Sequence, residues 1–131
     1  MRVFFDHNLP PALARAMNEL FQPEHEARAL REKFPANVSD VEWITELSRD
    51  GRWVVISGDR RITRNRAEQA AFRNSRLIGM FLAPALCRAP VAKQAERILA
   101  LWPSIEILAN TVAGGAMFEM PMTSTRPRQI R

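Results

Sequence analysis

The stretch Trp53-Val54-Val55-Ile56-Ser57-Gly58-Asp59 starts with large apolar residues and breaks at a glycine. A strand covered by helices on both faces of a sheet has this composition, because neither face contacts water. Residues 77–82 repeat the pattern, and residues 2–5 repeat it in a shorter form. These three segments predict central strands of a buried, mainly parallel sheet.

The segments between these strands carry apolar side chains at the spacing of helices that are buried along one face. Asn8, Ser39 and Asn65 stand where a side chain can cap the first turn of such a helix. Helices are therefore predicted over residues 8–22, 39–50, 65–73 and 91–102, the last closed by Pro103. Strands that alternate with helices imply right-handed crossovers, so we predict an α/β fold with helices on both faces of the sheet.

The remaining segments have weaker patterns. We predict a strand over residues 25–30 and a short edge strand over residues 117–120. Residues 105–112 could form a helix or a last strand, and the helix is favoured. Residues 123–131 contain arginines but no apolar side chain beyond Ile130. We therefore expect one domain over residues 1–122, followed by a basic C-terminal tail without regular structure.

Composition narrows the class of protein. The chain has 131 residues, 47% of them hydrophobic, which suits one domain with a single core. Its formal net charge is +5, and all 19 basic residues except Lys33 and Lys93 are arginine. This balance indicates an anionic partner, although a GC-rich genome would also raise the arginine content. Cys87 is the only cysteine and no window is apolar enough to span a membrane, so we expect a cytoplasmic protein.

Several enzyme classes do not fit the sequence. There is no glycine-rich phosphate loop. His7 and His25 are the only histidines, and with one cysteine they cannot build a usual zinc site. His7 could support a neighbouring ligand or be an exposed turn residue, and the exposed turn residue is favoured.

Acidic residues follow two of the predicted strands. Asp6 comes after residues 2–5, and Asp59 comes after residues 53–57. Ligands bind beyond the carboxyl ends of parallel strands, and neighbouring strands lie about 5 Å apart. If the strands are neighbours, both carboxylates could hold Mg²⁺ or Mn²⁺, which prefer oxygen ligands and can activate water against a phosphodiester. Each aspartate alone is also common in turns, but their equivalent positions favour a function.

Asp40 and Glu42 open the helix predicted over residues 39–50, and either could supply a third carboxylate. Glu42 could instead close a capping box with Ser39, and Asp40 would be stabilised by the helix dipole in any case. The sequence does not choose between them.

A cluster of arginines follows Asp59 directly: Arg60, Arg61, Arg64 and Arg66. An arginine side chain can bind a phosphate group through two parallel hydrogen bonds. The cluster therefore predicts a contact surface for an RNA backbone. The alternative is a solvated, charged turn. The tryptophans Trp43, Trp53 and Trp102 lie in apolar patterns, so we expect them in the core rather than stacked on bases.

Three segments, in this order and spacing, resemble PIN-like nucleases, in particular the branch of VapC-type toxin ribonucleases: Phe5-Asp6-His7-Asn8-Leu9-Pro10, Ser39-Asp40-Val41-Glu42-Trp43-Ile44 and Trp53-Val54-Val55-Ile56-Ser57-Gly58-Asp59-Arg60-Arg61. The resemblance implies a three-layer α/β/α fold, endoribonuclease activity, and Mg²⁺ or Mn²⁺ held by clustered carboxylates. It also implies RNA and a cognate antitoxin protein as partners; a homodimer is a further assembly to test.

By motif, Asp6 and Asp59 match the acids that end two strands, and Asp40 with Glu42 matches the acidic region that opens the intervening helix. Asn8 would support these ligands from beside the first acid. One departure is that many PIN domains carry a fourth acid after a later strand, where this chain has Ala83-Pro84. This departure weakens the case for two bound metals.

Two other readings stay open. A phosphoacceptor receiver domain also places aspartates at strand ends, but it would need an acidic pair after the first strand and a lysine after a late one. A catalytically weak module that binds RNA or a partner protein is the stronger rival. Metal binding in solution would separate it from a nuclease.

Overall fold

Six strands form one sheet in the computed structural model, which describes residues 1–131. The order across the sheet is β2 (Glu26–Ala29), β1 (Arg2–Phe5), β3 (Trp53–Ser57), β4 (Ile78–Leu82), β5 (Met117–Met120) and β6 (Arg128–Ile130). Every neighbouring pair is parallel except β5 with β6. The predicted α/β class and mainly parallel sheet are confirmed. The strand predicted over residues 117–120 is confirmed as β5, but its predicted edge position is wrong, because β5 lies between β4 and β6.

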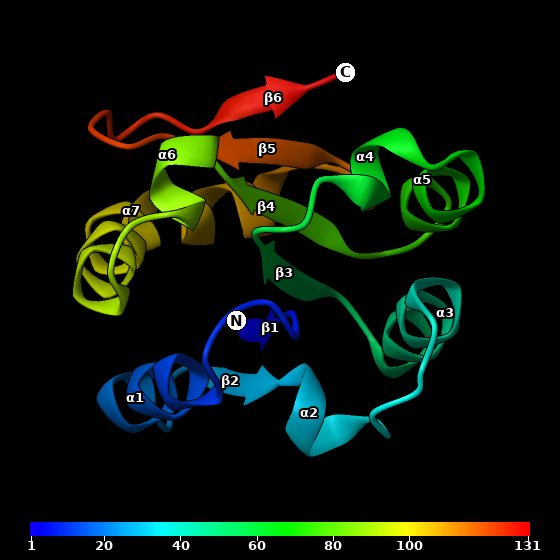
Figure 1. Ribbon diagram of the computed structural model, residues 1–131, viewed down its shortest axis with the longest axis horizontal. Helices are drawn as coiled ribbons and strands as arrows, with labels where there is room; N and C mark the ends of the chain where they lie inside the picture. The colour runs from blue at the N-terminus through cyan, green and yellow to red at the C-terminus, as the bar shows by residue number, and fades with distance from the viewer.

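Helices cover both faces of the sheet and complete three layers (Figure 1). The helices α1 (Pro11–Phe21) and α7 (Val91–Thr111) cover one face, and α3 (Asp40–Asp50) and α5 (Arg66–Arg73) cover the other. Three one-turn helices were not predicted: α2 (Leu30–Lys33), α4 (Arg61–Arg64) and α6 (Pro84–Cys87). No helix of the fold combines the length and apolar character that a bilayer crossing requires.

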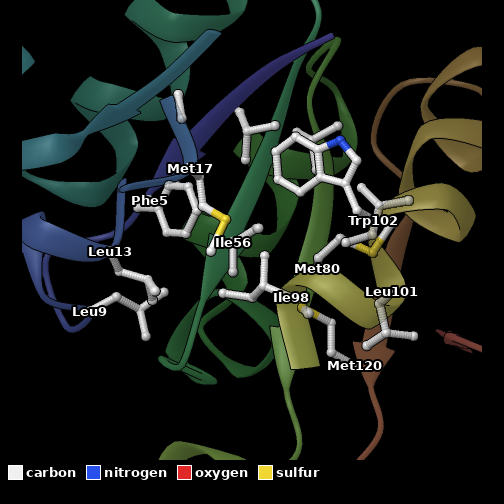
Figure 2. Close-up of a cluster of buried hydrophobic side chains, with 14 of the residues drawn as sticks. Phe5, Leu9, Leu13, Met17, Ile56, Met80, Ile98, Leu101, Trp102 and Met120 are labelled. Atoms are coloured by element: carbon white, nitrogen blue, oxygen red, sulfur yellow. The ribbon is translucent and has the colours of Figure 1, made fainter. Parts of the chain in front are cut away.

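A separate apolar core fills each side of the sheet. In the first, Phe5 and Ile56 pack with Met17 of α1 and Trp102 of α7 (Figure 2). In the second, Phe4 of the sheet packs with helix residues such as Trp43 and Phe72. Successive side chains of a strand point to opposite faces, so a strand between two cores must be apolar at every position. This arrangement explains why β3 and β4 are buried throughout.

Helix α7 continues through Pro103, so the prediction that this proline closes the helix is wrong. Proline removes one backbone hydrogen bond and usually bends or breaks a helix. Here Pro103 is exposed, while Leu101 and Ile105 on either side of it are buried against the sheet. The apolar face on both sides of Pro103 therefore keeps the helix continuous.

Two of the predicted helix caps are confirmed and one is wrong. The side chains of Ser39 and Asn65 each accept a hydrogen bond from the backbone N–H three residues later. Asn8 caps nothing, since α1 begins only at Pro11. The Asn8 side-chain oxygen instead accepts a hydrogen bond from the N–H of Gly58 at 3.3 Å.

Part of the C-terminal segment belongs to the sheet, so the expectation of no regular structure there is wrong. Residues Arg128–Ile130 pair with β5 as β6. Ile130 packs against the second core, and Arg128 forms an ion pair with Glu119 at 3.2 Å. The buried Arg97 of α7 also donates hydrogen bonds to the carbonyls of Pro121 and Ser124. Contacts from distant elements therefore order a segment with little apolar content of its own.

Candidate active site

The loops after β1 and β3 meet at the carboxyl edge of the sheet. These strands are parallel neighbours, with Phe5 beside Ile56. Ser57, the last residue of β3, joins the two loops. Its hydroxyl donates a hydrogen bond to Asp6 Oδ2 at 2.8 Å and accepts one from the N–H of Asp59 at 3.0 Å. The condition for a shared site, that the two aspartates follow neighbouring strands, is therefore met.

Asp6 is a buried carboxylate, with only 1% of its surface exposed. Its Oδ1 accepts a hydrogen bond from the N–H of His7 at 2.7 Å and lies 2.8 Å from the Nδ1 atom of the same residue. With Ser57 on Oδ2, both oxygens have partners, which a buried charge requires. His7 is therefore only half-exposed and fixes Asp6, whereas the sequence predicted an exposed turn residue.

Asp59 is bound by Arg61 through both of its oxygens. The N–H of Arg61 donates to Oδ1 at 2.9 Å, while Nε and Nη2 of the same residue lie 2.8 Å and 2.6 Å from Oδ2. Burial acts to raise the pKa of Asp59, but the hydrogen bonds and charge of Arg61 outweigh it, so the pKa lies below its ordinary value. Asp59 is thus ionised and paired.

Asp40 is the first residue of α3 and is held by a core side chain. The indole Nε1 of the fully buried Trp43 donates to Asp40 Oδ1 at 2.8 Å. Asp40 lines the same hollow as His7 and Arg61. Glu42 is exposed and lines a different hollow. Of the two acids that the sequence left open, the structure brings only Asp40 to the sheet edge.

Glu68 is an acid of this region that the sequence interpretation missed. It lies in the first turn of α5, and its Oε2 is buried without a hydrogen-bond partner. Burial raises the pKa of Glu68, and the negative charge of Asp40 raises it further. The spacing from Asn65 was interpreted only as a cap, and no other feature of the local sequence marks Glu68.

Arg61 is the cation shared by these acids. Its hydrogen bonds with Asp59 raise the pKa of the guanidinium, and the charges of Asp59, Asp40 and Glu68 act in the same direction. No three acidic, histidine or cysteine side chains are arranged as a metal-binding group in this structure. The acids nevertheless come from three separate elements to one edge of the sheet.

A family model described as a PIN-like domain matches residues 1–84, more than half of the chain. The chain belongs to the PIN-like domain family. PIN-like domains are generally nucleases, so membership indicates a nuclease-type protein. No curated protein and no solved structure matches the chain.

The matched part of this PIN-like domain contains β1 to β4 and all of the acids described above. Helix α7 and strands β5 and β6 lie beyond it. One residue of that later part still reaches the site region: Glu119 of β5 forms an ion pair with Arg60 at 2.5 Å. Arg60 also donates to the carbonyl of Leu82 at 3.2 Å. This arginine is therefore tied to the sheet, unlike the free phosphate ligand that the sequence predicted.

The other arginines of the predicted cluster face solvent. Arg64 and Arg66 are exposed and form no ion pair. Two hollows of about 550 Å³ each flank the acids, and both are lined by His7 and Arg61. The first also contains Arg31, and the second also contains Arg64, Arg88 and Asn8. The two hollows share His7 and Arg61 and are here together named the arginine groove. Arg31 and Arg88 were not predicted, because neither is near Asp59 in sequence.

Proposed function

We propose that this PIN-like domain is a metal-dependent endoribonuclease of the cytoplasm and the VapC-type toxin of a toxin–antitoxin pair. The observation that carries the proposal is the position of three acids near the carboxyl edge of one parallel sheet. Ser57 links Asp6 to the loop of Asp59, and Asp40 and Asp59 each line a hollow that contains Arg61.

The chemistry of the donors suits a hard divalent cation, although the three carboxylates are not arranged as a metal-binding group in this structure. All three side chains are carboxylates, and Mg²⁺ in proteins commonly uses one or two carboxylates together with water. Asp6, Asp40 and Asp59 would hold Mg²⁺ or Mn²⁺. When bound, the cation supplies an activated water and offsets the charge that develops on a phosphodiester.

The side chains around the acids hold the acids in position and would orient the RNA. Trp43 holds Asp40 in place, and Ser57 holds Asp6 relative to the loop of Asp59. Arg31, Arg64 and Arg88 line the arginine groove and would bind successive phosphates of an RNA strand. Arg61 is common to both hollows, so it would leave Asp59 for a phosphate as the metal and RNA bind.

The charge of the chain also fits an antitoxin as partner. A protein with a formal net charge of +5 and an arginine groove attracts acidic surfaces. An acidic antitoxin segment laid in that groove would exclude RNA. A homodimer would double the available RNA surface.

A catalytically weak module that binds RNA or a partner protein is the second candidate. It is favoured by the absence of a three-acid metal group in the structure and by the absence of an acid directly after β4. It needs the arginine groove but not the carboxylates.

Cleavage of a mixed RNA substrate in Mg²⁺ or Mn²⁺, with EDTA as the blank, tests the proposal. Asp6→Asn and Asp59→Asn should each abolish cleavage while the fold, measured by circular dichroism, stays intact. Glu96→Gln is the matched control, because Glu96 is an exposed acid of α7 paired with Lys93. Wild-type protein that binds RNA but neither binds metal nor cleaves would replace the nuclease by the binding module.

A further inference from the structure

A row of four residues in register crosses the sheet near its carboxyl edge. The row runs through four neighbouring strands: Ser57 of β3, Phe81 of β4, Glu119 of β5 and Arg128 of β6. Residues directly opposite each other on neighbouring strands point to the same face of a sheet. Ser57 begins the row at the candidate site, because its hydroxyl accepts a hydrogen bond from the N–H of Asp59. The row therefore leads from the site loop to the C-terminal strand.

The side chain of Arg60 reaches over this row from the loop after β3 to β5. Its guanidinium donates to the carbonyl of Leu82 at 3.2 Å and forms the ion pair with Glu119 at 2.5 Å. Only 22% of the Arg60 side chain and 18% of the Glu119 side chain are exposed. A pair so far from solvent is screened less than a surface pair, so Glu119 holds Arg60 strongly.

Arg60 stands between the two residues of the loop that the proposed reaction uses, Asp59 and Arg61. The carbonyl of Arg60 accepts hydrogen bonds from the N–H of Thr63 at 3.0 Å and from its hydroxyl at 2.6 Å. Backbone and side chain of Arg60 are therefore both fixed. The side chain of Arg61 is exposed in contrast, and it would leave Asp59 when a cation or a phosphate binds.

We infer that Glu119 is a positioning residue of this site: through Arg60 it holds the loop of Asp59 in place while Arg61 changes partners. The inference rests on the proposed function, because the loop belongs to the proposed nuclease site. Glu119 lies beyond residues 1–84, so this support comes from outside the family-matched part of the chain. Without Glu119 the partly buried guanidinium of Arg60 would lack its anion, and the loop would lose its attachment to β5.

Amide hydrogen exchange in EDTA measures how well the loop is held, without metal or RNA. The N–H of Asp59 bonds to Ser57 Oγ and the N–H of Arg61 bonds to Asp59 Oδ1, so both amides report opening of the loop. Glu119→Gln should lower their protection about 10-fold or more, because a hydrogen bond between charged groups is lost.

Arg128→Gln is the matched control. It removes the other ion pair of the same carboxylate, at 3.2 Å, on the side away from the site. The Arg128 side chain is 76% exposed, and this variant should leave the loop amides as protected as in the wild type.

Cleavage kinetics of a mixed RNA substrate with Mn²⁺ measure the consequence for the reaction. Glu119→Gln should lower kcat roughly 10- to 100-fold, because a small displacement of the loop misplaces Asp59. KM should stay close to the wild-type value, since the exposed arginines of the arginine groove are intact. Arg60→Gln should give the same loss of kcat, and the double variant should be no slower, because both substitutions act through one ion pair.

The outcomes separate the inference from the function on which it rests. Loop protection in Glu119→Gln equal to that in Arg128→Gln overturns the inference. Lower protection with unchanged kcat also overturns it, because Glu119 would then only stabilise the fold. A wild type that cleaves no RNA overturns the proposed function, and hydrogen exchange alone then decides whether Glu119 positions the loop. If Glu119→Gln does not fold, Arg60→Gln is measured in its place, since Glu119 there keeps Arg128 as a partner.

Discussion

Replacing Arg61 should change metal and RNA binding in opposite directions. Arg61 occupies Asp59 and lines both hollows of the arginine groove. A cation at Asp59 must displace the Arg61 guanidinium. RNA, in contrast, would be bound by the same guanidinium through a phosphate. Arg61→Gln keeps much of the side chain and removes the charge. We therefore expect tighter binding of Mn²⁺ and weaker binding of RNA.

The magnitude follows from the contacts of Arg61. Its side chain is 66% exposed and that of Asp59 is 13% exposed, so the ion pair is screened by water. An exposed pair is worth up to about 1 kcal/mol, and this is what the metal must overcome. Repulsion between a guanidinium and a divalent cation about 4 Å away adds about 2 kcal/mol in a water-like dielectric. A total of about 2–3 kcal/mol corresponds to roughly 30- to 150-fold tighter Mn²⁺ binding.

Two titrations of the same variant measure these effects. Calorimetry gives the Mn²⁺ affinity without RNA. RNA affinity is measured in EDTA over a series of salt concentrations. The slope of log affinity against log salt concentration should be smaller by about one, since one phosphate contact is lost. Arg49→Gln is the control, because Arg49 is an exposed arginine paired with Glu46 on α3. Mn²⁺ affinity that is unchanged or weaker in Arg61→Gln, with a normal control, would refute the idea that Arg61 and the metal compete for Asp59.

Three further predictions concern the supports of the site and the fold. Trp43→Phe should lower the free energy of unfolding by about 1.5–3 kcal/mol and weaken Mn²⁺ binding, because Asp40 loses a buried donor. Urea unfolding measures the first effect and calorimetry the second, and normal Mn²⁺ affinity in the variant would contradict the prediction. Glu119→Gln should cost about 1–3 kcal/mol in urea unfolding, because it leaves the partly buried Arg60 without its anion; a loss below about 0.5 kcal/mol would mean that the pair is not structural. Asp50→Asn should lower the melting temperature more at pH 7 than near pH 3, since the hydrogen bond from Trp53 lowers the pKa of Asp50. The resulting stabilisation is complete above the unfolded-state pKa and is lost as the pH falls through the folded-state pKa. An equal loss of melting temperature at both pH values would exclude this charge effect.

The central strands could be predicted because their composition has only one good explanation. An apolar run such as β3 must be covered on both faces, and that requirement alone implies helices on each side. Asp6 and Asp59 follow from the same reasoning, as residues at the ends of such strands. These predictions need no knowledge of distant contacts.

Other predictions failed where contacts from distant elements decide the outcome. Glu42 and Glu68 have the same local pattern, a capping residue three positions earlier, yet one faces solvent and the other has an oxygen buried beside Asp40. Arg60 and Arg61 are adjacent, but Arg60 meets Glu119, which is 59 positions further along the chain. No local spacing carries that information.

The position of β5 between β4 and β6 limits what the family-matched residues can do alone. A fragment ending at residue 84 would leave one side of the fully apolar β4 without a strand partner. It would also uncover the first core where Leu101 and Trp102 of α7 now pack. Unpaired apolar edges recruit other chains, so such a fragment should aggregate instead of acting as a minimal nuclease. The region that defines the family by sequence is therefore smaller than the unit that can fold and remain dispersed.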